Sequence, residues 1–362
     1  MPTLPDLFRD PSQLIASIPA SLGYTPQREL VLIVVSATVE PRSPKPALVV
    51  RSVTATSSLT ESVAKILKRL RRAAQGAAAF ATFAIVVDDR FADSPPGSPH
   101  RTTIRRLIDE LTDEFTRGPA PLVGAWATRE IAAGAPWFAL VGEPEHGVIA
   151  DPTLTDNSQE RIIAGQILHG SKQDMADSLV PDLAAATELA RFLPSANSDA
   201  KRRRDCAERH DQWARHHRHC LETVLWRIAD VAAGDSIPFA LLANLTAVMT
   251  ERKVLDCLHA TAVGEYLMAA EQLWILLIRS LTGPERAEPA TLLAYSAYLR
   301  GDGPLAGVAL DIALSARSSH VIARLLHACL SAGLAPQTLP RIARFGVAAA
   351  TDLGVDIGEW QS

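Results

Sequence analysis

The first strongly apolar segment of the chain is the run LVLIVV at residues 30–35. It has no polar residue at alternate positions, which is typical of a strand buried on both faces. Ahead of it, Asp10 is a good helix N-cap and Pro11 suits the first helical position. Gly23 and Pro26 then allow the chain to turn. This pattern predicts a short helix folded back against the first central strand.

Strand and helix periods alternate through the rest of the first half. The predicted strands cover residues 30–35, 47–53, 80–87, 121–128, 137–141 and 148–150, and the predicted helices residues 58–75 and 102–115. We expect the second strand to be antiparallel to the first. Neither GxGxxG nor GxxxxGK[ST] occurs at a junction between a strand and a helix. The sequence therefore predicts an α/β domain with a mixed sheet over residues 1–155, without the common phosphate-binding loops.

From about residue 158 the strand pattern gives way to helical periods. The expected helices cover residues 198–231, 238–249, 251–260, 263–281, 287–300, 304–316, 319–332 and 336–349. Ser198 is the expected N-cap of the longest helix, and Gly234 follows its end. The pattern predicts an all-α domain over residues 156–362.

Small residues near 289–332 follow the spacing of a tetratricopeptide repeat, in which two antiparallel helices approach closely. They are Gly301, Ala306, Ala313 and Ala323, with Leu314 among them and Ala309 as a further small residue. The proline that usually closes such a unit is replaced by Ser318. We expect a tight turn at residues 301–303 and buried alanines at the helix crossing. A generic helical hairpin is the alternative.

Four stretches of the chain resemble one actinobacterial family, domain of unknown function family 4192. LIASIPASLGYTPQRELVLIVV resembles its N-terminal hallmark, and LLAYSAYLRGDGPLAGVALDIALSARSSHVIARLL resembles its C-terminal signature. KVLDCLHA and AAEQLWILLIRSL fit between them. The family pattern usually has a serine where this chain has Glu29, so the resemblance gives that position no catalytic role. It implies no established activity.

Composition narrows the class of protein. Apolar residues make up 48% of the 362 residues, the net charge is −4, and there are four cysteines. Such a chain can form ordinary packed cores, and its charge does not suit a protein that mainly coats nucleic acid. The N-terminus lacks a signal-peptide pattern, and no apolar run reaches the roughly 18 residues of a membrane helix. We expect a cytoplasmic protein with reduced thiols and no membrane partner.

The segment KRRRDCAERHDQWARHHRHC, residues 201–220, is the most conspicuous polar patch. Cys206 with His210, and His216 with Cys220, have the i, i+4 spacing of metal ligands on a helix. On one continuous helix the two pairs would lie about 15 Å apart, too far to share an ion. A solvated or interface helix, with its Cys and His residues on the packed face, is therefore the preferred interpretation, and no metal or other cofactor is predicted.

The same patch offers phosphate contacts at Lys201, Arg202, Arg203 and Arg204. Trp213 falls on the expected packed face, where it could not stack on a base. Nucleic-acid binding through residues 201–220 is therefore only an alternative, and weak at most.

Asp88 and Asp89 follow the third predicted strand, where open α/β sheets place ligands and where paired carboxylates can bind Mg²⁺. A polar loop exit is the simpler interpretation. No catalytic motif was identified, so the leading hypothesis is a non-catalytic protein-interaction module that binds a protein partner or self-associates through its helical half. A ligand- or nucleotide-binding enzyme or sensor in the α/β half is the alternative from a different class.

Overall fold

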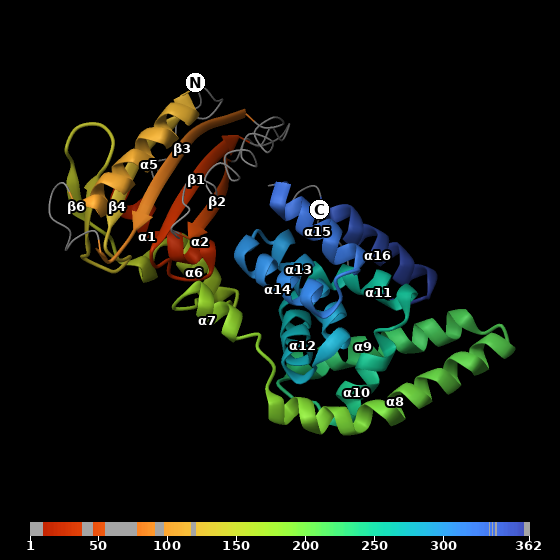
Figure 1. Ribbon diagram of the computed structural model, residues 1–362. Coiled ribbons are helices and arrows are strands. Elements are labelled where there is room, and N and C mark those ends of the chain that lie inside the picture. The colour runs from red at the N-terminus through yellow and green to blue at the C-terminus, as the bar shows by residue number, and fades with distance from the viewer. Residues whose placement is uncertain are drawn as a thin grey trace. The chain divides into compact units, whose positions relative to one another are not determined.

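The computed structural model describes residues 10–37, 46–54, 78–90, 98–116, 121–332, 334, 336 and 339–357. The chain forms two compact units (Figure 1). The first comprises Met1–Asp174 with Ser331–Gly333, and the second comprises Met175–Leu330 with Leu334–Ser362. The first unit extends past residue 155, where the sequence analysis draws the boundary, because it includes helix α6 (Asp156–Ile163). The predicted helix at residues 58–75 lies outside the described residues.

The first unit contains a mixed sheet whose six described strands run in the order β2-β1-β3-β4-β5-β6. The strands are β1 (Glu29–Ala37), β2 (Pro46–Thr54), β3 (Ala78–Val87), β4 (Leu122–Thr128), β5 (Pro136–Ala139) and β6 (His146–Val148). Strands β3 and β4 are parallel, and the other neighbouring pairs are antiparallel. The mixed sheet and the antiparallel pairing of the first two strands are both confirmed.

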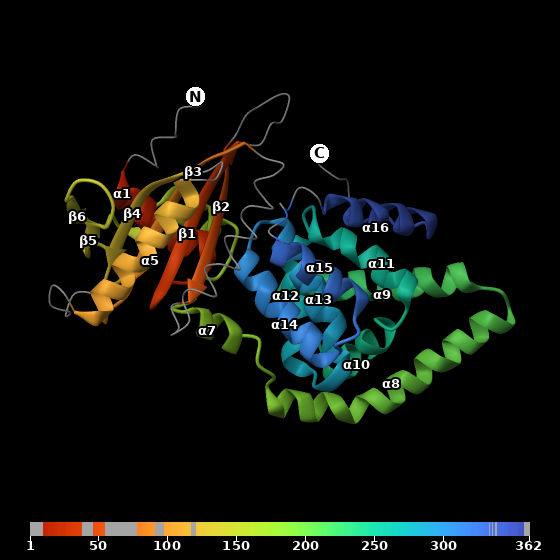
Figure 2. The same cartoon turned by 45° about the horizontal axis from the view of Figure 1, so that its top comes forward.

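Helix α5 (Pro99–Thr116) covers one face of this sheet (Figure 2). Its apolar side chains form a core cluster with alternate residues of β1, β3 and β4. The other face of β1 carries Val31, Ile33 and Val35, which are also buried. Strand β1 is thus buried on both faces, as its continuous apolar run predicts.

Two short helices, α1 (Pro11–Ala16) and α2 (Ile18–Leu22), precede the sheet. The Asp10 carboxylate accepts a hydrogen bond from the Ser12 amide at 2.9 Å, which confirms the predicted N-cap. Gly23 ends α2 with φ +77°, a conformation that favours glycine. The chain then turns directly into β1.

A hydrogen bond between Tyr24 and Glu29 stabilises this turn. The buried Tyr24 hydroxyl donates a hydrogen bond to Glu29 Oε2 at 2.9 Å. Backbone hydrogen bonds join Thr25 N to His169 O at 3.0 Å and His169 N to Gly23 O at 2.9 Å. The abrupt change from helix to strand is therefore held by local polar contacts and by a distant part of the same unit.

The second unit is helical in its described residues. After α7 (Lys172–Asp177), its helices are α8 (Leu183–Arg209), α9 (Trp213–Ala233), α10 (Phe239–Val248), α11 (Arg252–Leu258), α12 (Leu267–Ser280), α13 (Ala287–Leu299), α14 (Gly303–Ala316), α15 (Val321–Ala332) and α16 (Pro340–Asp352). None of the helices that the structure describes has the length and apolar character needed to cross a bilayer.

Helices α13 and α14 pack against each other across the expected tight turn, where Gly301 has φ +86°. Ala306, Ala309 and Ala313 are fully buried, as expected of small residues at a helix crossing. The assignment of this pair to the tetratricopeptide class stays a prediction.

The single helix predicted at residues 198–231 is wrong. Helix α8 already begins at Leu183, where Asp182 is its N-cap and accepts hydrogen bonds from the next amides, so Ser198 lies in the helix interior. The helix ends at Arg209, and Asp211 adopts φ +51° in the turn before α9. The chain reverses there, so residues before and after the turn do not share one helical stripe.

Candidate functional site

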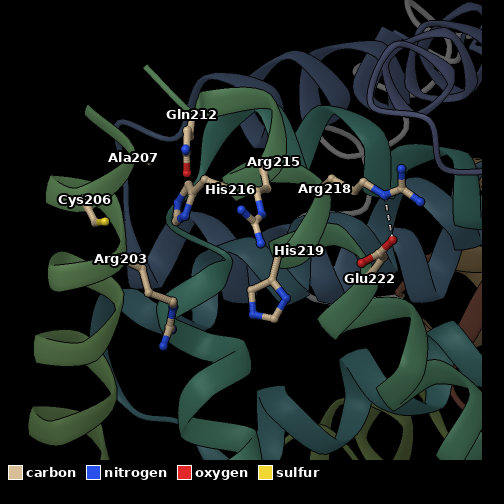
Figure 3. Close-up of a pocket in the computed structure, with 9 residues that line it drawn as sticks. All are labelled: Arg203, Cys206, Ala207, Gln212, Arg215, His216, Arg218, His219 and Glu222. Atoms are coloured by element: carbon tan, nitrogen blue, oxygen red, sulfur yellow. Dashed lines mark hydrogen bonds and ion pairs between the residues drawn. The ribbon is translucent and has the colours of Figure 1, made fainter. Parts of the chain in front are cut away.

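Because of this turn, the end of α8 faces the beginning of α9 across an open pocket of about 590 Å³ (Figure 3). Arg203 and Cys206 line it from α8, and Arg215, His216 and His219 line it from α9. The Arg203, Arg215 and His219 side chains point into the space between the two helices. The turn therefore gathers nitrogen-rich side chains in one hollow.

The charges in this pocket are mostly positive. Arg218 forms an ion pair with Glu222 at 2.8 Å, with Nε facing the carboxylate. Among the described residues, neither Arg203 nor Arg215 forms a side-chain hydrogen bond or an ion pair. Two unpaired guanidinium groups in one hollow create a positive potential that attracts anions.

The four predicted phosphate contacts are not brought together. Lys201 is exposed, and Arg202 pairs with Asp199 on its own helix. Arg204 pairs with the carboxylate of Glu251, as described below. Only Arg203 enters the pocket, where it meets Arg215 rather than its neighbours in sequence.

Glu251, which precedes α11, joins three helices through its buried carboxylate. Its Oε1 lies 2.8 Å from Arg204 Nε and 3.4 Å from His216 Nε2, and its Oε2 lies 3.7 Å from His217 Nε2. Burial alone would raise the pKa of Glu251, but the hydrogen bond and charge of Arg204, with the contact to His216, lower it below its ordinary value. Burial lowers the pKa of His217. This cluster fixes α8, α9 and α11 together.

Cys220 lies beside this cluster but lacks the geometry of a catalytic nucleophile. His216 Nε2 is 3.7 Å from Cys220 Sγ, and the same nitrogen faces Glu251. A catalytic histidine instead uses one ring nitrogen for the nucleophile and the other for the orienting carboxylate. Burial raises the pKa of Cys220 to about 11, so it is a protonated thiol at neutral pH. The contact is structural.

The turn also changes the geometry of the two Cys/His pairs. Cys206 and His216 lie on two different helices and line the same pocket, so a separation calculated along one continuous helix does not apply to them. In the part of the chain that the structure describes, no group of three or more His, Cys, Asp or Glu residues could hold a metal ion.

Asp88 and Asp89 lie at the end of β3, as predicted, and each faces an arginine. Asp88 is buried, and its Oδ2 accepts from Arg90 Nη2 at 2.7 Å. Asp89 accepts from Arg28 Nε and Nη2 at 2.8 and 2.9 Å. The hydrogen bond from Arg28 lowers the pKa of Asp89 to about 2. The two carboxylates thus form ion pairs at the end of the strand, an arrangement that disfavours a cation site.

Trp226, a residue that the sequence patterns did not single out, is 66% exposed on α9. A second hollow, of about 230 Å³, lies beside this ring and shares Arg203 and His219 with the first pocket. By contrast Trp213, the aromatic residue considered in the sequence, stacks on His217 with ring centroids 5.6 Å apart. The missed signal was the i, i+7 spacing of His219 and Trp226, which places both residues on one face of a helix.

Comparisons with known proteins identify a family and no closer relative. No curated protein and no solved structure matches the chain. One family model, described as Domain of unknown function (DUF4192), matches residues 11–337. The match begins at the first residue of α1, takes in the sheet and continues through α15. The chain therefore belongs to the DUF4192 family.

Proposed function

We propose that the protein is a non-catalytic, cytoplasmic interaction module that binds an acidic segment of a partner protein on helix α16. The observation that carries this proposal is Phe345, an aromatic residue of α16 that is 74% exposed. Exposed aromatic residues are typical anchors of protein interfaces. The four cysteines, all free thiols, fit a reducing compartment.

The inner face of α16 fixes which residues point outward. Gly346 packs so closely on the segment around α11 that a Cβ there would lie 2.8 Å from Asp256 O and 2.9 Å from Ala260 N. Ala343 and Ala350 are fully buried on the same side. The rotation of the helix is therefore fixed by backbone contact, and Phe345 faces solvent.

Tyr295 of α13 holds the beginning of α16. Its buried hydroxyl accepts a hydrogen bond from Ala343 N at 2.9 Å and donates one to Leu339 O at 3.0 Å. Burial raises the pKa of this phenol, so it stays neutral and can donate. A helix held in this way offers a preorganised surface, which reduces the entropy lost on binding.

The charges around Phe345 favour an acidic partner. Arg341 is exposed on the same face, and α16 contains no carboxylate before Asp352. An acidic segment with an apolar anchor would complement this surface in both charge and hydrophobicity. A second copy of the chain would bring like charges together across a two-fold contact, so self-association through this face is disfavoured.

Capture from native lysate with matched variants tests the proposal. Immobilised wild-type protein should retain a specific partner in a salt-sensitive way, and Phe345→Glu should lose it while keeping its melting temperature. Trp226→Ala is the control: it removes an exposed aromatic side chain from α9 instead of α16, and this variant should retain the partner. A partner that binds Phe345→Glu as well as wild type would refute the role of α16. If instead the wild-type protein forms concentration-dependent dimers that Phe345→Glu abolishes, the ligand of this face is a second copy of the chain rather than an acidic partner.

A further inference from the structure

We propose that the pocket between α8 and α9 binds a nucleotide: its phosphate chain would lie on Arg203, Arg215 and His219, and its base on Trp226. The site lies on different helices from the Phe345 surface, and the inference does not depend on the proposed function.

Two arginines from opposite helices form the part of the site that would bind the phosphate chain. Arg203 and Arg215 lack carboxylate partners among the described residues, so neither has to give up an ion pair to bind an anion. Guanidinium groups bind phosphate oxygens through paired, charge-assisted hydrogen bonds. His219 lines the same hollow and can add a further donor. The volume of about 590 Å³ falls within the range of about 300–1,000 Å³ typical of small-molecule sites.

The base end rests on an exposed aromatic ring. Trp226 and Leu241 line the second hollow, together with Arg203 and His219. Every base has a π-face, so stacking on tryptophan accepts bases without strong sequence preference. The same ring would gain little from inorganic phosphate, because that ligand has no apolar surface.

The spacing along α9 matches a ligand that is charged at one end and aromatic at the other. Arg215, His219 and Trp226 follow at i, i+4 and i+11, so they lie on one face of the helix. At a rise of about 1.5 Å per residue, Trp226 lies about 10 Å along the axis from His219 and about 16 Å from Arg215. One phosphate group cannot reach both ends, whereas a nucleoside polyphosphate combines the two chemistries in one extended molecule.

Isothermal titration of the full chain with ATP tests the proposal. We expect saturable, salt-sensitive binding, with weaker binding of tripolyphosphate and of adenosine alone. Changing both Arg203→Ala and Arg215→Ala should weaken ATP binding by about 100-fold, as expected for two lost charged contacts. Trp226→Ala should weaken ATP binding by about tenfold and leave tripolyphosphate binding unchanged. Arg202→Ala, which removes a neighbouring arginine paired with Asp199, is the matched control and should bind as wild type.

Cys206 supplies an independent readout, because it is exposed and lines the pocket while Cys220 and Cys257 are buried. Bound ATP should slow alkylation of Cys206, and this protection should disappear in the double arginine variant. Three results would each overturn the proposal: no ATP binding at millimolar concentration, ATP binding unaffected by the arginine changes, or equal binding of ATP and tripolyphosphate. If a short single-stranded oligoadenylate binds far more tightly than ATP, the ligand of this site is nucleic acid rather than a free nucleotide.

Discussion

Arg204 of α8 and Glu251, just before α11, form a partly buried ion pair, with Arg204 Nη2 2.7 Å from Glu251 Oε1. His216 and His217 of α9 approach the same carboxylate, at 3.4 and 3.7 Å. The pair therefore connects the two helices of the cationic pocket to a third helix. Arg204, one of the four predicted phosphate contacts, therefore has an internal partner.

Removing this carboxylate should destabilise the helical unit. We expect Glu251→Gln to lower the free energy of unfolding at pH 7 by about 1–3 kcal/mol, because Arg204 loses its charged partner. Denaturant titration measures this change. Glu222→Gln, which breaks the exposed pair with Arg218, is the control and should change stability by less than about 1 kcal/mol. Equal effects of the two variants would contradict the argument.

The same pair predicts a dependence on pH. The pKa of Glu251 in the folded chain lies below its ordinary value of 4.5. A depressed carboxyl pKa stabilises the folded state above the unfolded pKa, and this contribution is lost as the pH falls through the folded pKa. The stability difference between wild type and Glu251→Gln should therefore be full above about pH 5 and shrink as the pH is lowered below 4.5. A difference that grows toward low pH would mean that the pair does not depress this pKa.

Thiol reactivity should follow burial. Burial raises the pKa values of Cys220 and Cys257 to about 11, whereas Cys206 is exposed. At pH 8 an aromatic disulfide reagent should modify Cys206 first and reach the two buried thiols only after denaturant is added, because the thiolate is the reactive form. Mass spectrometry of labelled peptides distinguishes the sites. Rapid labelling of Cys220 in the native protein would show that α9 opens readily.

The sequence patterns that correctly predicted helices and strands involve residues close together in the sequence. The run at residues 30–35 predicted β1, because a strand covered on both faces needs no polar alternation. The i, i+3 and i+4 spacing of apolar residues at 102–115 predicted α5, because this spacing places them on one face of a helix. In both cases the residues that define the element are adjacent or one turn apart.

The candidate site could not be predicted because it depends on one turn without a breaker. Asp211 adopts φ +51° between α8 and α9, and neither glycine nor proline occurs at residues 210–212. Pro194, a residue type that usually disrupts a helix interior, lies inside α8. Arg203 and Arg215 line one pocket because of that turn, so a single continuous helix does not predict that they lie together.

Packing of α14 gives a further prediction. Ala313 is fully buried, so Ala313→Leu should overpack the helix crossing and lower the free energy of unfolding by about 1–3 kcal/mol. Ser315→Leu places the same side chain at an exposed position two residues away and should change stability by about 0.5 kcal/mol or less. Thermal unfolding of the two variants provides the comparison, and an unchanged melting temperature for Ala313→Leu would mean that this face of α14 is not packed.

Two helical glycines should respond in opposite directions to the same substitution. In an open helix interior, glycine to alanine adds about 1 kcal/mol of stability, because alanine restricts the unfolded chain and has the higher helix propensity. Gly307 of α14 meets this condition, since a Cβ there would have one ordinary contact, with Leu330 Cδ2 at 3.8 Å. Gly346 of α16 does not, because its Cβ would lie 2.8 Å from Asp256 O, a backbone atom that cannot turn away.

We therefore expect Gly307→Ala to raise the melting temperature and Gly346→Ala to lower it, the second by the equivalent of about 1–3 kcal/mol because α16 must shift outward. The shift of α16 should also change partner binding. If Phe345 anchors a partner, Gly346→Ala should weaken that binding even at temperatures at which the unit is folded. Gly307→Ala should leave the binding intact. Calorimetry and the capture experiment test the two consequences separately. Stabilisation by both substitutions would show that α16 does not rest on the backbone of residues 256–260, and the fixed orientation of Phe345 would then lose its physical basis.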